Sequence, residues 1–100
     1  MKIIYVTLNN NEEAKKIGRK ILEHNLANCV NFFPITCIYN YKDEITEEPE
    51  VVLIIKTLEE KYSEIEKLIR GEIDYDNFIG ELNVNQINSN FEDWLQEVVK

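Results

Sequence analysis

The sequence has few of the residues that interrupt regular structure: its 100 residues include only three Gly and two Pro. Together with an apolar content of 44%, this scarcity is typical of a folded domain and excludes a disordered or low-complexity chain. A chain of this length encloses one hydrophobic core, so we predict a single domain over residues 1–100.

Basic residues are scarce as well. Eleven Lys and Arg stand against 19 Asp and Glu, which gives a formal charge of −8. Such a surface repels phosphate backbones, so we expect no nucleic-acid partner. The same charges can attract cations, or they can serve only to keep a small subunit soluble.

Long hydrophobic segments are absent too. The longest apolar run is residues 51–55, far short of the roughly 20 residues needed to cross a bilayer, so we expect no membrane partner. The first residues lead straight into a strand-like pattern without the apolar region of a signal peptide. We therefore expect a cytoplasmic protein, in which Cys29 and Cys37 are reduced.

The motifs of the common enzyme classes are missing. The sequence contains no phosphate-binding loop, zinc-finger spacing, nucleophile elbow or dinucleotide fingerprint. His24 is the only histidine, and its spacing to the Ser and Cys residues identifies no nucleophile that it would activate. We predict a protein that is not an enzyme and assign no catalytic residue.

The first half of the chain predicts a strand, a helix and a second, long strand. Residues 3–8 are apolar and β-branched. Asn10 can cap a helix whose apolar side chains recur at helical spacing, and Asn25 suits a left-handed cap at its end. Residues 27–41 are rich in β-branched and aromatic side chains. Pro34 within this strand indicates an edge position or a bulge.

Residues 42–44 predict a hairpin turn, and residues 51–56 are the strongest part of the returning strand. Pro49, just before them, indicates an irregular or edge segment. Long strands with bent outer halves can pair beyond their own sheet, so this hairpin is the candidate subunit contact.

The second half of the chain predicts another helix, a strand and a last helix. Thr57 with Glu60 forms a capping box for a helix that Gly71 ends. Residues 75–84 contain the fourth predicted strand, and Ser89 with Glu92 opens the terminal helix. The order β-α-β-β-α-β with a C-terminal helix predicts an α+β, ferredoxin-like sandwich with an antiparallel sheet.

Two groups of residues are candidates for metal binding from their chemistry alone. Cys29 and Cys37 are eight residues apart on one strand, about 26 Å, so one ion cannot bridge them within a chain. Either thiolate can bind Cu(I) across an interface, or serve as a small buried apolar residue. The acidic residues between 43 and 50 can collect hard cations loosely or form a solvated hairpin tip.

Six segments, spread from residue 14 to residue 95, form a recognisable set: residues 14–17, 26–31, 33–35, 38–39, 50–57 and 93–95. They resemble the CutA family, and the resemblance covers most of the chain. The resemblance implies a PII-like homotrimer whose hairpins pair between neighbours and whose clefts lie between subunits. It also implies a non-enzymatic role in divalent-cation tolerance or the response to metal ions, with copper binding.

The resemblance also implies site residues. Cys29 matches the cysteine of an Ala-x-Cys-Val-Asn segment, and Asp76 stands for the glutamate of a His-Pro-Tyr-Glu segment, which implies copper or another divalent cation at these two residues. Lys56 and Tyr75 match residues of the cleft and are the predicted ligand-binding pair for an anionic metabolite, if the protein is instead a PII-like sensor. A trimeric scaffold is the third alternative. Ile73 replaces the family's histidine, which removes a borderline-soft metal ligand.

Overall fold

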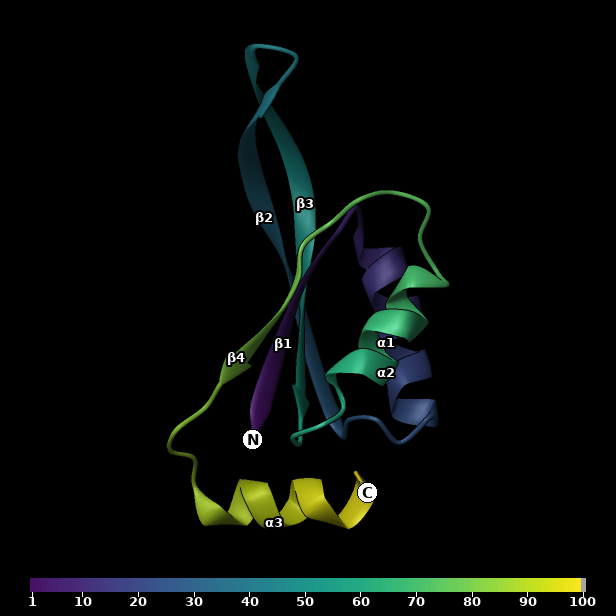
Figure 1. Ribbon diagram of the computed structural model, residues 1–100, viewed down its shortest axis with the longest axis vertical. Coiled ribbons are helices and arrows are strands. Elements are labelled where there is room, and N and C mark those ends of the chain that lie inside the picture. Colours follow the sequence, from purple (N-terminus) through teal and green to yellow (C-terminus); the bar gives the residue numbers. More distant parts are fainter. Residues whose placement is uncertain (100) are drawn as a thin grey trace.

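The computed structural model describes residues 1–99 as one four-stranded antiparallel sheet with three helices (Figure 1). The elements are β1 Lys2–Leu8, α1 Asn11–Glu23, β2 Cys29–Tyr41, β3 Glu44–Thr57, α2 Tyr62–Arg70, β4 Ile79–Asn83 and α3 Ser89–Val98. The strand order is β2-β3-β1-β4, and every neighbouring pair is antiparallel. The predicted ferredoxin-like fold with a terminal helix is therefore confirmed. Within residues 1–99, no helix is both long and apolar enough to cross a membrane.

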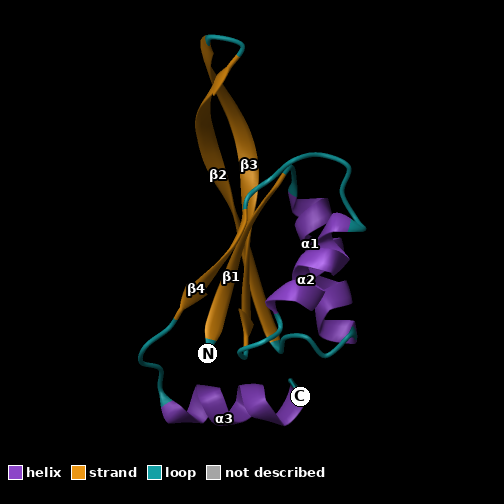
Figure 2. Ribbon diagram, viewed as in Figure 1, coloured by secondary structure: helices purple, strands orange, loops and turns teal. Residues whose placement is uncertain are grey.

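The helices α1 and α2 cover one face of the sheet, and α3 lies beyond its end, near the N-terminus (Figure 2). Side chains alternate between the two faces of a strand, so every second residue of β1 and β3 points into the layer between sheet and helices. This layer is the hydrophobic core, which includes Ile4, Val6, Ile17, Ile21, Leu53, Ile55, Ile65 and Ile69.

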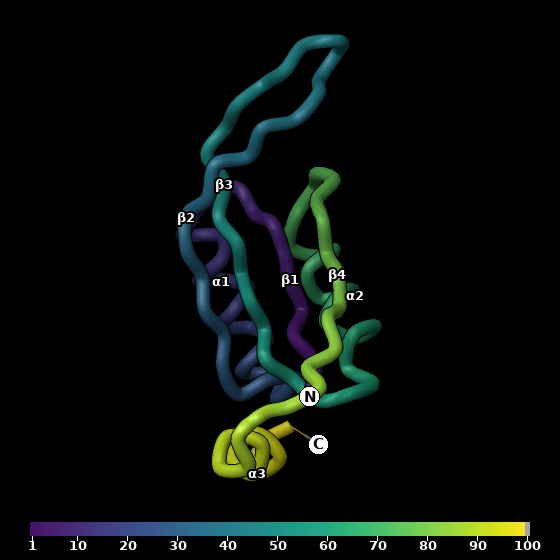
Figure 3. The backbone as a smooth tube through the Cα atoms, turned by 90° about the vertical axis from the view of Figure 1, so that its left-hand side faces the viewer, coloured from purple at the N-terminus to yellow at the C-terminus, as the bar shows by residue number. Residues whose placement is uncertain are grey.

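The strands β2 and β3 are much longer than β1 and β4. β2 and β3 pair without interruption from Cys29 opposite Lys56 to Tyr41 opposite Glu44, whereas β1 ends at Leu8. Beyond that point the sheet narrows to a two-stranded ribbon that leaves the rest of the molecule (Figure 3). We call residues 35–50 the projecting hairpin and the rest of the described chain the body.

Local sequence rules explain several of the boundaries. The Asn10 side chain accepts a hydrogen bond from the backbone N–H of Glu13 at 2.8 Å, as an N-cap does. Asn25 has φ 56°, so the predicted left-handed cap is confirmed. Pro34 lies on the edge strand β2 in an unbroken register, so the edge position is confirmed and the bulge is wrong. Pro49 is paired too, in a part of β3 that lies beyond the end of β1.

The capping box of Thr57 and Glu60 is also wrong. Thr57 is the last residue of β3, and its hydroxyl donates to the carbonyl oxygen of Leu26 instead of capping a helix. α2 starts only at Tyr62, after a turn in which Glu60 has φ 70°. A buried hydroxyl must find an acceptor, and that requirement outweighed the local pattern.

The terminal helix is confirmed, with a different cap from the one expected. Ser89 is its first helical residue, Asn88 holds the N-cap position, and no side chain bonds the cap. Leu95 is the only buried residue of α3, and the neighbouring Trp94 is exposed.

Candidate functional site

The four predicted site residues lie at opposite ends of the sheet. Cys29 and Lys56 are direct cross-strand partners at the α3 end, and the Lys56 ammonium lies 5.5 Å from the ring centre of Phe91. Tyr75 and Asp76 line a pocket at the other end, separated by the length of β1, about 20 Å. Within one chain, neither predicted pair, Cys29 with Asp76 or Lys56 with Tyr75, comes together.

The pocket around Tyr75 lies where β1 ends and the projecting hairpin continues, so we call it the fork pocket. Its volume is about 470 Å³. It is lined by Thr7, Leu8, Asn9, Cys37, Tyr39, Glu48, Glu50, Tyr75, Asp76, Asn77 and Phe78. These residues come from the end of β1, from one face of the hairpin and from the loop between α2 and β4.

The hairpin wall of the fork pocket follows from strand register. Cys37 is paired directly with Glu48. Tyr39 and Glu50 each lie two residues further along their strands, and side chains two residues apart share a face. The unbroken register therefore places a thiol, a phenol and two carboxylates side by side.

The loop wall is held in place by hydrogen bonds to the body. The Asn77 amide donates to the backbone carbonyl of Thr7 at 2.7 Å, and the Phe78 N–H donates to the Thr7 hydroxyl at 3.1 Å. The Tyr75 hydroxyl donates to the carboxylate of Glu13 at the start of α1. The loop that carries Tyr75 and Asp76 is thus fixed to both β1 and α1.

Phe78 is positioned by its neighbours on the open face of the sheet. Its ring packs edge-on against Tyr5 with 6.0 Å between ring centres. Gly80 leaves the space that the ring occupies, because a Cβ at Gly80 would lie 2.4 Å from the ring. An alanine at this position would push Phe78 out of its place beside the pocket.

The fork pocket is strongly acidic. Three carboxylates line it, from Glu48, Glu50 and Asp76, and none of its lining residues is Lys, Arg or His. Its other titratable groups stay neutral near pH 7. Burial raises the pKa of the Cys37 thiol, and the nearby Glu50 carboxylate raises it further.

The phenols of the fork pocket are held in their protonated form in the same way. Burial raises the pKa of Tyr39, and a hydrogen bond with Glu48 adds to the effect. Burial also raises the pKa of Tyr75, together with its hydrogen bond to Glu13. The three carboxylates are therefore the charges that an incoming ligand meets.

The donors do not form a complete metal site within one chain. Across residues 1–99, no three His, Cys, Asp or Glu side chains lie close enough together to hold one ion. The sequence pointed to Cys37, Glu48 and Glu50 separately, as a thiol and as part of an acidic run. Only the register of the hairpin, fixed by a two-residue turn at Lys42 and Asp43, unites them.

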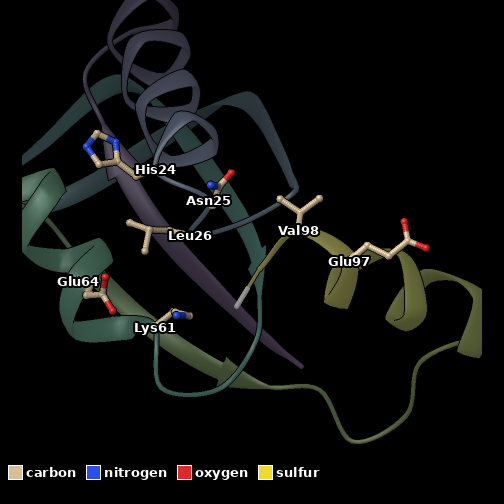
Figure 4. Close-up of a pocket in the computed structure, with 7 residues that line it drawn as sticks. All are labelled: His24, Asn25, Leu26, Lys61, Glu64, Glu97 and Val98. Atoms are coloured by element: carbon tan, nitrogen blue, oxygen red, sulfur yellow. The ribbon is translucent and has the colours of Figure 1, made fainter.

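A second pocket, of about 560 Å³, lies at the opposite end of the molecule, between the end of α1, the start of α2 and the end of α3 (Figure 4). His24 and Glu97 stand on opposite sides of it. The His24 ring donates from Nδ1 to the carbonyl oxygen of Lys20 at 2.8 Å, so it is bound to its own helix. Lys61 and Glu64 bring opposite charges to the lining, which therefore favours no class of ligand.

Comparisons with known proteins agree on one relationship. The family model described as CutA1 divalent ion tolerance protein matches residues 2–98. The divalent-cation tolerance protein CutA of Thermotoga maritima is 38% identical over 100 residues, which cover 99% of each chain. Protein CutA of Homo sapiens is 35% identical over 96% of this chain and 55% of the human protein.

Solved structures show the same similarity in three dimensions. The periplasmic divalent cation tolerance protein CutA from Archaeoglobus fulgidus superposes with a TM-score of 0.94 at 32% identity, covering all of both chains. CutA1 from Pyrococcus horikoshii gives a TM-score of 0.92 at 29% identity, over 100% of this chain and 99% of that one. The similarity therefore extends over the projecting hairpin as well as the body.

Proposed function

Because the chain belongs to the CutA1 divalent ion tolerance family, we propose that it is a non-enzymatic homotrimer that binds copper or another divalent cation and acts in tolerance of such ions. The observation that carries this proposal is the fork pocket, which is lined by three carboxylates and by no basic side chain. Carboxylate oxygens suit hard and borderline cations, and the acidic pocket attracts any cation electrostatically.

The residues of the pocket fit a metal only in part. Asp76, Glu48 and Glu50 supply oxygen donors, and Cys37 supplies a soft donor once its thiol has lost the proton. In the proposed trimer, a neighbouring copy completes the ligand set. Cys29, the metal ligand implied by the family resemblance, lies at the other end of its own chain, so it can join Asp76 only from a different copy.

The projecting hairpin supports assembly into a homotrimer. An isolated two-stranded ribbon is marginally stable in water. Apolar side chains nevertheless stand on this one, with Ile38 65% and Ile45 79% exposed. Covering them with the hairpins of other copies would bury this surface and extend the sheet across subunits.

The cytoplasmic location remains a prediction. The similar protein from Archaeoglobus fulgidus is described as periplasmic, so the family name alone does not decide the compartment.

Calorimetric titration of metal-free protein with Cu(II), Zn(II) and, under reducing conditions, Cu(I) tests metal binding, and the native mass of the same sample tests the trimer. We expect micromolar uptake that falls about tenfold or more in Asp76→Asn and Cys29→Ser. Asp74→Asn is the matched control, because Asp74 is an exposed carboxylate two residues away that does not line the pocket. No uptake of any of the three ions at micromolar levels would refute the metal proposal, and a monomeric mass would refute the trimer.

The PII-like sensor of an anionic metabolite is a weaker candidate. Tyr75 lies among carboxylates, which repel anions, and Lys56 lies against Phe91 at the other end of the sheet. The two residues can act together only from different copies. A thermal shift with nucleotides that is lost in Lys56→Met would favour this candidate over metal binding.

A further inference from the structure

The fork pocket has the size of a site for a small organic molecule. Small-molecule sites have volumes of roughly 300–1,000 Å³, and the fork pocket, which is open on one side, has a volume of about 470 Å³. A single metal ion would fill only a small part of this space. The volume therefore leaves room for a ligand beyond, or instead of, an ion.

The lining of the fork pocket combines aromatic rings with negative charge. Tyr39, Tyr75 and Phe78 contribute three rings, among the three carboxylates. Ring faces attract ammonium groups, and carboxylates form charge-assisted hydrogen bonds with them. An anionic ligand would be repelled, and a neutral one would leave the negative charge of the three carboxylates unbalanced.

The carboxylates stand on two different walls. Glu48 and Glu50 project from β3, whereas Asp76 belongs to the loop between α2 and β4. The loop wall is fixed to the end of β1 by the hydrogen bonds of Asn77 and Phe78 to Thr7. A ligand with two separated positive charges could pair with carboxylates on both walls at once, whereas a ligand with one charge could pair with those of one wall only.

We propose that the fork pocket binds a small linear polyamine, an organic cation with two or more protonated amino groups. The rings of Tyr39, Tyr75 and Phe78 contact its methylene chain and ammonium groups, while Glu48 and Glu50 on one side and Asp76 on the other pair with its charges. The proposal does not depend on metal binding, because every interaction in it is made by groups of this chain.

Calorimetric titration of the full-length protein with spermidine and putrescine, in buffer free of added metal, tests the proposal. We expect saturable binding, tighter for spermidine, with no binding of the dianion succinate. In Glu48→Gln/Glu50→Gln, affinity for spermidine should fall about tenfold or more, because two charge-assisted hydrogen bonds are lost.

The chain offers matched controls for both kinds of contact. Glu44→Gln/Glu47→Gln removes the same charge from the same strand outside the pocket and should change the affinity less than about twofold. Tyr39→Leu should weaken binding several-fold, whereas Phe32→Leu, which removes an exposed ring from the same strand outside the pocket, should not.

Two results would overturn the proposal: no saturable binding of spermidine up to millimolar concentration, or equal weakening in the two glutamate double variants, which would show attraction to the overall charge only. Metal uptake measured on the same samples keeps the outcomes apart. Protein that binds copper or zinc but no polyamine refutes this inference alone.

Discussion

The body and the projecting hairpin share two continuous strands but differ in what stabilises them. In the body, side chains such as Val6 and Leu53 are completely buried beneath the helices. In residues 35–50, every side chain is either exposed or only half-buried. Burial of apolar surface is the main favourable term in folding, so the body contains its own source of stability and the hairpin does not.

One unbroken register runs through both regions, so backbone pairing alone does not reveal this difference. The hairpin depends on cross-strand pairs, on the body from which it extends and on any copy that covers it. The comparison can be tested with pairs of substitutions, one in each region.

Removing a large apolar side chain should have the largest effect. Leu53→Ala leaves a cavity in the core and should lower the free energy of unfolding by about 2–5 kcal/mol. Ile45→Ala, at a position 79% exposed, should change it by less than about 0.5 kcal/mol in the monomeric chain. Urea unfolding measures both.

Protein concentration extends this test. In the proposed trimer, the effect of Ile45→Ala should grow as the protein concentration rises, because a covering copy stabilises only the assembled form. A larger loss from Ile45→Ala than from Leu53→Ala at any concentration would contradict the comparison.

Replacing threonine by valine should have the next largest effect. In the body, Thr57→Val leaves the carbonyl oxygen of Leu26 without its donor in a fully buried site, and should cost about 1–3 kcal/mol. In the hairpin, Thr36→Val changes an exposed position opposite Pro49, and should be neutral within about 0.5 kcal/mol or slightly stabilising. Equal effects in thermal unfolding would show that the hydroxyl of Thr57 contributes nothing.

Glycine at left-handed positions should have a smaller effect, of opposite sign. Lys42 and Asp43 form the hairpin turn with φ 49° and 65°, a conformation that favours Asn-Gly. Lys42→Asn/Asp43→Gly should stabilise the hairpin by about 0.5–1 kcal/mol. Asn25→Gly in the body, where Asn already tolerates φ 56°, should gain only a few tenths of a kcal/mol.

Amide hydrogen exchange of the hairpin distinguishes these two variants. Protection of residues 35–50 should rise in the turn variant and stay the same in Asn25→Gly. Faster exchange in the turn variant would mean that the native side chains make contacts that the glycine removes.

The smallest expected effect is a pH dependence within the body. The Glu72 carboxylate accepts a hydrogen bond from Lys20 at 2.9 Å and lies 3.6 Å from the Lys16 ammonium; these contacts, that with Lys20 above all, lower its pKa below the ordinary 4.5. A lowered folded-state pKa stabilises the protein above the unfolded-state value, and this contribution disappears as pH falls through the folded-state value. Glu72→Gln should therefore be less stable than the native chain at neutral pH, and the two should converge in acid. A constant difference between their stability curves would rule out this ion pair as the cause.

Elements whose signals are local could be predicted from the sequence. The cap at Asn10, the left-handed residue Asn25 and the edge position of Pro34 each depend on backbone preferences of one short segment. The capping box predicted at Thr57 is wrong because the hydrogen-bond partner of this residue, Leu26, lies 31 residues earlier in the chain.

The candidate site was predictable only in part, for the same reason. Tyr75 and Asp76 could be carried over from a family segment. Cys37 and Glu48, which line the same pocket, could be placed there only once the register of the hairpin was known. The loop between α2 and β4 is held at the pocket by a hydrogen bond from Asn77 to Thr7, two residues that are 70 positions apart in the sequence. Contacts between residues so far apart in the sequence depend on how the whole chain folds, so a short sequence pattern does not predict them.

The glutamates of the projecting hairpin have a consequence for the behaviour of the protein in concentrated solution. β2 forms one edge of the sheet. Beyond the end of β1, β3 is paired only with β2, so its other side is an edge too. Both edges present unpaired backbone groups with which strands of other molecules could pair. Four glutamates, at positions 44, 47, 48 and 50, act as gatekeepers through mutual repulsion, and Pro34 and Pro49 remove backbone donors. Replacing these four glutamates with apolar residues would remove the repulsion and leave the hairpin as a template to which other strands could add.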